Sequence, residues 1–465
     1  MPPTGETIIS KGIPVTTESQ QLTAIAGKPA LQRIPTYLRL SGPGWLQGAM
    51  TLGGGSAITS LTIGGVYGYE LLWVQPLSML IGCIMLFALS HQTLSTGIKP
   101  FAAMRDYVHP SVAWLWAIAA LASSIIWGFS HYPLSAGMLE EIIDVSLGFN
   151  LKEGEGMARE MYLFVLAVLV WMVCAYTAWN YGAGGRAVKI FETAIKFLST
   201  MIILAFLWVV LTASANGQVD WGAVLSGYIP RSLPTDSAGV TTIMAALGTA
   251  VGINMTFVYG YTLLDRGWGA EHRELSRYDI VMGLVIPYVL VTGLISIAAA
   301  GAFYGSDMSI QGKLAPAQAG AMFADAGMGP VTGRLIFAIG ILGMAVGSLV
   351  MHMLCCGAAA GAMFGWEPHS RKYRLALLLP TPAVLGVFLW STMGAYVILP
   401  TSAICGFLLP IAYLAWLFLN NNRDYLGEDC PQGNRRLWSN IAMLLCIAVV
   451  LASVTYSTGI KLNWF

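Results

Sequence analysis

Eleven apolar segments, each long enough to cross a lipid bilayer as a helix, follow one another along the chain. A membrane-spanning helix needs roughly 20 predominantly apolar residues. The expected spans are residues 43–65, 70–95, 112–138, 160–181, 190–212, 240–266, 279–304, 330–363, 374–392, 396–419 and 437–456. Only 10% of the residues are charged, whereas soluble domains carry about 25%. The chain is therefore expected to be an all-α membrane protein with about 11 transmembrane helices.

The charged residues outside the spans give the expected orientation. With the N-terminus in the cytoplasm, most Lys and Arg residues of the loops, such as Arg266, Arg273 and Arg436, fall on the cytoplasmic side, as the positive-inside rule requires. An odd number of spans then places the C-terminus outside. Residues 1–40 are polar and are expected to form a cytoplasmic N-terminal tail, followed by a transmembrane domain over residues 41–465. No cleavable signal peptide is recognised. The expected location is the cell (inner) membrane.

Several function classes receive no support from the sequence. The glycine-rich turn Gly182–Gly185 lacks the strand and the lysine of a phosphate-binding loop. A formal net charge of +1 gives no reason to expect nucleic acid as a partner. The expectation is a protein that is not an enzyme, has no cofactor and has the lipid bilayer as its partner. The oligomeric state cannot be derived from these features.

Two of the expected spans contain sequences that disfavour a continuous helix. The first has Gly53–Ser56, three glycines and a serine, ten residues after Pro43. That distance is roughly 15 Å of helix, or half the hydrocarbon thickness. The sixth has Gly248–Asn254 near its middle, and an asparagine is costly in lipid unless it lines a cavity or finds a partner. Both spans are predicted to be discontinuous at the middle of the bilayer.

Breaks at matched positions of two five-helix halves are typical of transporters with an inverted repeat. The halves would be residues 41–215 and 240–420, with residues 437–456 as an additional helix. Backbone groups freed at the breaks would face a substrate, because free polar groups are not tolerated in lipid. The predicted substrate-binding residues are Gly53, Gly55, Ser56, Thr249, Gly252 and Asn254. The alternative is that these glycines serve only the close packing of helices.

Short motifs in a fixed order carry a resemblance to a known family. They are Gly42-Pro43, Val66-Tyr67-Gly68-Tyr69, Thr96-Gly97, Asp220-Trp221-Gly222-Ala223, Leu247-Gly248 and Leu409-Pro410. Over roughly residues 40–420 the chain resembles the natural resistance-associated macrophage protein (NRAMP) family of metal-ion transporters. The resemblance implies the LeuT-type fold, with a 5+5 inverted repeat and discontinuous helices 1 and 6. It also implies proton-coupled uptake of divalent metals such as manganese and iron.

The motifs that form the metal site of this family are replaced here. The Asp-Pro-Gly-Asn motif of the first break falls on Gly53–Ser56, and the Met-Pro-His motif of the sixth falls on Gly252–Asn254. Further family positions, a histidine, an acid and a glutamine, fall on Tyr259, His131 and Ser402. These three residues are candidates for a proton relay or a gate. The chain is similar to a divergent bacterial branch of NRAMP-related proteins.

The remaining polar groups set the expected substrate. The hydroxyls of Ser56 and Thr249, the amide of Asn254 and freed carbonyls are neutral oxygen donors, with Ser56 and Asn254 as candidate metal ligands. Such a set suits magnesium, which keeps several waters, better than manganese or iron, which favour carboxylate with sulfur or imidazole. One alternative is a small organic solute or amino acid. A second is a non-transporting membrane sensor or scaffold.

The eighth span holds a cluster of residue types that bind soft metals. Its members are Met351, His352, Met353, Cys355 and Cys356. Residues four apart share a helix face, so His352 and Cys356 could approach one ion. The alternative is helix packing, because Met and Cys fill apolar gaps well.

Overall fold

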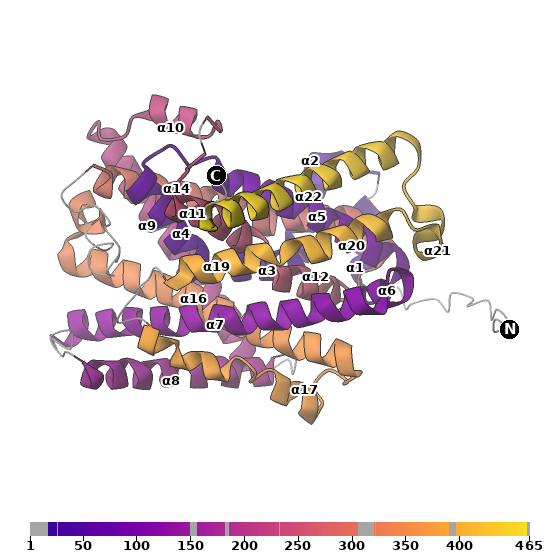
Figure 1. Ribbon diagram of the computed structural model, residues 1–465, viewed down its shortest axis with the longest axis horizontal. Helices are drawn as coiled ribbons and strands as arrows, with labels where there is room; N and C mark the ends of the chain where they lie inside the picture. The colour runs from indigo at the N-terminus through magenta and orange to yellow at the C-terminus, as the bar shows by residue number, and fades with distance from the viewer. Residues whose placement is uncertain are drawn as a thin grey trace.

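The computed structural model describes residues 17–25, 27–148, 156–181, 186–231, 233–305, 320, 322–389 and 397–462. Its long helices lie side by side along the horizontal axis of Figure 1. The helices are α1 (Thr17–Ile25), α2 (Ala30–Leu40), α3 (Pro43–Thr51), α4 (Gly54–Tyr67), α5 (Val74–Thr96), α6 (Pro100–Tyr107), α7 (Pro110–Leu147), α8 (Met157–Asn180), α9 (Arg186–Ala215), α10 (Trp221–Gly227), α11 (Ser237–Ala250), α12 (Ile253–Asp265), α13 (Arg273–Ile280), α14 (Ile286–Phe303), α16 (Pro330–Phe364), α17 (Arg371–Ala376), α19 (Ile398–Phe407), α20 (Leu409–Asn420), α21 (Arg423–Leu426) and α22 (Gly433–Lys461). Short 3-10 and π-helical segments are η2 (Ala270–His272), η3 (Val281–Val285), η4 (Ala324–Met328), η5 (Thr381–Gly386) and η7 (Gly427–Asp429).

Within the described residues, nine helical segments are long and apolar enough to cross a membrane. The first expected span, which is divided into α3 and α4, is not among these nine, and the apolar part of the fifth is the shorter stretch Thr200–Ala215. Large apolar side chains on α8, α9 and α22, such as Val173, Leu204 and Leu445, are exposed. Such side chains belong next to lipid tails, as expected for an all-α membrane protein.

Both predicted helix breaks are present. Between α3 and α4, Leu52 has φ −77° and ψ 59°, and Gly53 has φ −107° and ψ −176°. Between α11 and α12, Val251 has φ −143° and ψ 94°, and Gly252 has φ −72° and ψ 162°. Each break spans two residues, after which the helix resumes at Gly54 and at Ile253.

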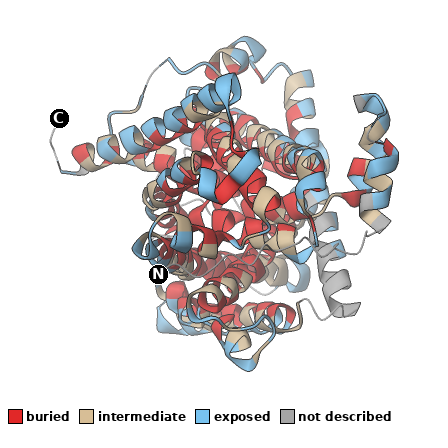
Figure 2. Ribbon diagram, turned by 90° about the vertical axis from the view of Figure 1, so that its right-hand side faces the viewer, coloured by how far each residue is buried: buried red, intermediate tan, exposed pale blue. Residues whose placement is uncertain are grey.

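The broken helices lie in the middle of the bundle. Figure 2 views the helices from the side that is on the right in Figure 1, and the buried residues gather at the centre. The halves α3 and α4 pack on η3 and α14, α11 and α12 both pack on α5, and α11 also packs on α19. Around them, α7 and α16 pack against each other along their length. Spans three and eight therefore flank the two breaks.

Glycine permits the closest of these contacts. A Cβ atom added at Gly64 of α4 would lie 2.0 Å from the carbonyl oxygen of Ser296 on α14. A Cβ atom added at Gly248 of α11 would likewise lie 2.0 Å from the carbonyl oxygen of Ser402 on α19. Real side chains do not approach a carbonyl this closely, so only glycine fits here. Close packing is therefore a role of Gly64 and Gly248, and the packing alternative for the glycines of the two breaks stays open.

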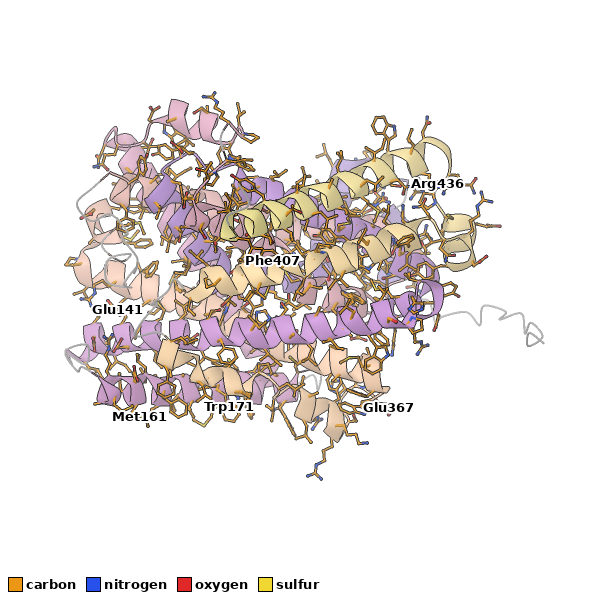
Figure 3. The ribbon with its side chains drawn as sticks, viewed as in Figure 1. Glu141, Met161, Trp171, Glu367, Phe407 and Arg436 are labelled. Carbon is orange, nitrogen blue, oxygen red and sulfur yellow. The ribbon has the colours of Figure 1, made fainter. Side chains whose placement is uncertain are left out.

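The two ends of the bundle carry separate ion pairs. Glu141 and Glu367 mark opposite ends in Figure 3. Helix α7 continues past the expected end at residue 138 to Leu147, and it buries Glu140 and Glu141, which pair with Arg159 and Arg334. Buried carboxylates need such partners, which explains how Glu140 and Glu141 can be buried at this end of the bundle.

The other end carries α1 and α2, which belong to the segment expected as an N-terminal tail. Arg33 of α2 pairs with Glu274 of α13 at 2.8 Å, and Glu18 of α1 accepts a hydrogen bond from Trp268. Nearby, Arg273 donates to Asp429 and thereby lowers the pKa of that carboxyl group below its ordinary value. The tail is therefore docked on the bundle from Thr17 onward.

The Gly64 contact gives a first prediction. Gly64→Ala should lower the free energy of unfolding by about 1–3 kcal/mol, because the added methyl group overpacks the crossing of α4 and α14. Gly301→Ala is the matched control, since nothing lies within 4 Å of a Cβ atom at Gly301 on α14. The control should be neutral or stabilising by about 0.5–1 kcal/mol. Melting temperatures of the purified proteins in one detergent measure both, and equal stability of the two variants would contradict the packing argument.

Candidate functional site

The two breaks meet at one small cavity in the centre of the bundle. Its volume is about 20 Å³, which is room for a single water molecule or ion. All six predicted substrate-binding residues line it, and they are Gly53, Gly55, Ser56, Thr249, Gly252 and Asn254. The structure therefore brings together, from two distant parts of the chain, the residues that the breaks singled out.

Of the three candidates for a relay or gate, one lines the central cavity and two do not. His131 of α7 lines the cavity. Tyr259 and Ser402 are buried away from it, with the Tyr259 hydroxyl 3.0 Å from the Ser276 hydroxyl and the Ser402 hydroxyl donating to the carbonyl of Ile398 in its own helix. Tyr259 and Ser402 thus lie outside the lining of the cavity, and a relay or gate role for any of the three stays a prediction.

Side chains from neighbouring helices occupy the space next to the glycines of the first break. A Cβ atom at Gly54 would lie 2.3 Å from Leu134 Cδ2, and one at Gly55 would lie 2.7 Å from the Trp127 ring. A Cβ atom at Gly53 would lie 2.9 Å from the hydroxyl oxygen of Ser348 on α16. The first break therefore brings backbone to the cavity, and the large side chains there come from α7 and α16.

Hydroxyl groups satisfy several of the carbonyls at the breaks. Thr51 at the end of α3 donates to the carbonyl of Ala250 at the end of α11, at 3.2 Å, which joins the two breaks directly. Ser56 donates to the Thr51 carbonyl at 2.7 Å, and Ser348 donates to the Met50 carbonyl at 3.1 Å. Since the Ser56 hydroxyl proton is used inside the break, only the lone pairs of its oxygen stay available to a cation.

Asn254, the other candidate metal ligand, is held at both ends of its amide. Its Oδ1 accepts from the backbone N–H of Met255 at 3.0 Å, and its Nδ2 lies 2.8 Å from Nδ1 of His352. The amide is 1% exposed. The sixth break is therefore linked by a side-chain hydrogen bond to the eighth span.

The cavity has further lining residues that the sequence analysis did not place there. They are Met50, Thr51, Trp127, Met255, Ser348 and His352. Trp127 and His352 stack with ring centroids 5.8 Å apart and an interplanar angle of 12°. A histidine in a long apolar span was the available signal for His352, because an imidazole at that depth needs a partner.

The cluster of the eighth span does not converge on one point. His352 faces the central cavity, whereas Met351 faces a separate vestibule and the Cys355 thiol lies 3.6 Å from the Asn254 carbonyl oxygen. Among the described residues, no three His, Cys, Asp or Glu side chains form a group that could hold a metal ion. The cluster therefore gives one cavity-lining residue, His352.

A large vestibule lies next to the cavity on one side. It has a volume of about 980 Å³ and is lined by Ala49 and Met351, whose chain neighbours Met50 and His352 line the central cavity. Glu367 lines the vestibule and lies at the end of the bundle opposite Glu141 (Figure 3). The vestibule thus lies between the central cavity and the end of the bundle that carries α1 and α2.

Known transporters are similar to this chain in sequence and in fold. A divalent metal cation transporter, MntH, of Brucella suis is 25% identical over 84% of this chain and 82% of its own length. The structure of a manganese transporter of Eremococcus coleocola superposes with a TM-score of 0.65 over 94% of both chains at 16% identity. MhsT, solved in complex with L-phenylalanine, superposes with a TM-score of 0.57 over 89% of this chain and 98% of its own at 16% identity.

These similarities confirm the fold expected from the sequence, the LeuT type with discontinuous helices 1 and 6. The repeat boundaries at residues 41–215 and 240–420 stay a prediction. The sequence profile described as "Natural resistance-associated macrophage protein-like" matches residues 44–458, and the chain belongs to this family of integral membrane proteins.

Proposed function

We propose that this chain carries a divalent metal cation across the membrane by alternating access through the central cavity. The observation that carries the proposal is the cavity itself, which lies where both breaks meet and is lined by hydroxyl, amide and imidazole groups. Relatives in the same family are named as divalent metal cation transporters. Its substrate would be a small cation, and the surrounding partner would be the lipid bilayer.

The size of the cavity supports a cation over the alternative of a small organic solute. About 20 Å³ holds one ion or one water molecule, and an amino acid needs several times that space. The fold alone does not distinguish a cation transporter from an amino-acid transporter, because MhsT has a similar structure and was solved with L-phenylalanine. A non-transporting sensor or scaffold is the outcome to infer if no solute moves.

The preference for magnesium over manganese and iron stays a prediction, and the cavity weighs against it. Magnesium was expected from the sequence because the recognised candidate ligands were all oxygen donors. The cavity adds the imidazoles of His131 and His352, together with the thioethers of Met50 and Met255. Nitrogen and sulfur donors favour borderline and soft transition metals over magnesium.

The orientation and membrane belong to the proposal as well. With the N-terminus in the cytoplasm of the inner membrane and the C-terminus outside, the vestibule opens to the cytoplasm. Lys99, Arg105 and Arg266 line it, in agreement with the excess of basic residues expected on that side. The structure then corresponds to an inward-facing state with the central site nearly closed.

Uptake into liposomes tests the proposal. Purified protein reconstituted in liposomes should take up at least one of Mg²⁺, Mn²⁺ and Co²⁺ above protein-free liposomes, and it should not take up glycine or alanine. Uptake of an amino acid without any metal uptake would replace the metal proposal by the organic-solute alternative.

A carboxylate restored at the first break gives a second test. Gly53→Asp introduces the acid that the family motif has, but its Cβ atom would lie 2.9 Å from the Ser348 hydroxyl oxygen. The variant is therefore made together with Ser348→Ala. The double variant should take up Mn²⁺ at least about tenfold faster at limiting concentration than Ser348→Ala alone, because a carboxylate is a strong ligand for this ion. An equal rate in the two proteins would show that position 53 does not face the cation.

A further inference from the structure

Two histidines from different helices meet at the wall of the central cavity. His131 of α7 and His352 of α16 have ring centroids 5.7 Å apart and an interplanar angle of 76°. They are 1% and 3% exposed. Neither belongs to a break, because both come from the pair of long helices that flank the broken spans.

His131 offers a free lone pair to the cavity. Its Nδ1 lies 3.0 Å from the carbonyl oxygen of Trp127 and 3.2 Å from the hydroxyl oxygen of Ser130. The carbonyl can only accept, and the Ser130 hydroxyl donates its own proton to the same carbonyl at 3.0 Å, so we assign the proton of His131 to Nδ1. Nε2 then has the lone pair, and it has no hydrogen-bond partner among the described residues. A Cβ atom at Gly54 would lie 3.7 Å from Nε2, so this nitrogen faces the first break. A carbonyl behind Nδ1 is also the usual support of a metal-binding histidine.

The lone pair of His352 is occupied by Asn254. Because Oδ1 of Asn254 accepts from the Met255 N–H, its Nδ2 must be the group that faces His352 Nδ1, 2.8 Å away. Nδ1 therefore accepts, and Nε2–H is directed to the Ser348 hydroxyl at 3.3 Å. In this state the amide of the sixth break covers the nitrogen that a cation would use.

We infer that His131 and His352 are the nitrogen ligands of a borderline divalent transition-metal ion, which displaces the Asn254 amide from His352. The inference rests on the proposed function and names its ligands and metal class. Two imidazoles on one tetrahedral ion with bonds of about 2.1 Å have ring centroids roughly 5 Å apart, close to the 5.7 Å observed. Backbone carbonyls of the breaks and water complete the shell.

This assignment changes the role of Asn254. As a ligand, its loss would weaken metal binding. As the group that covers His352, its loss exposes the nitrogen and leaves metal binding as strong or stronger. Displacement of the amide also breaks the hydrogen bond between Asn254 of the sixth break and His352 of α16. Binding of the ion would therefore remove one contact that holds the broken sixth span against α16.

The test is the binding of Co²⁺ alone to the full chain in detergent, followed by its visible absorption. The parent should show bands typical of nitrogen-ligated Co²⁺, and excess Mg²⁺ should compete poorly. His131→Gln and His352→Gln should each weaken the affinity by about tenfold or more. Asn254→Ala should bind at least as tightly as the parent.

His91→Gln is the matched control, because His91 is a buried histidine of α5 that lies 3.2 Å from the Asp429 carbonyl oxygen and does not line the cavity. It should bind Co²⁺ like the parent. His131→Asn serves as a second variant if His131→Gln is not monodisperse with a parent-like melting temperature.

Unchanged Co²⁺ affinity in both cavity variants would overturn the inference, and so would a loss in Asn254→Ala as large as that in His131→Gln. If the histidine variants instead change only the pH dependence of metal uptake, His131 is a relay and not a ligand. Metal uptake by the parent that survives in both histidine variants rejects the ligand pair but keeps the proposed function. A parent that neither binds Co²⁺ nor transports any metal rejects both.

Discussion

The backbone groups that two broken helices set free in the middle of a membrane are the constraint on which the rest of this structure depends. Each such group would cost several kcal/mol if it faced lipid. The Thr51 hydroxyl donates to the Ala250 carbonyl, and the Ser348 hydroxyl donates to the Met50 carbonyl. The breaks are therefore stable because hydroxyl groups of the first and eighth spans donate hydrogen bonds to the freed carbonyls. The two broken spans are buried for the same reason, because their freed backbone groups need protein partners.

Because the first break consists mainly of glycine, it provides few side chains to the site, and side chains of neighbouring helices take their place. Glycine at positions 53, 54 and 55 lets Ser348, Leu134 and Trp127 approach the backbone. The groups at the cavity that can bind a cation through nitrogen then come from α7 and α16. The site thus lies where the two breaks meet, while its imidazole nitrogens come from the third and eighth spans.

The sequence allowed the spans and both breaks to be predicted, because apolar length and runs of glycine are local signals. It also located Gly53–Ser56 and Thr249–Asn254 at one site, because matched breaks imply it. The depth of His352 in an apolar span indicated that it needs a partner, but the sequence did not show that this partner lies at a break, because the surrounding Met and Cys residues are equally suited to helix packing. Tyr259 and Ser402 were placed by alignment with a family, and an alignment gives a position in a helix but not the surroundings of a side chain.

The contacts at Gly64 and Gly248 have a consequence for how such a protein can change its cargo. At both positions a carbonyl of the neighbouring helix stands where a side chain would be, so these crossings admit no variation without a shift of whole helices. His131, Trp127 and His352 of α7 and α16 instead reach the central cavity with their side chains. Residues that line the site can therefore change while the close crossings at Gly64 and Gly248 are kept.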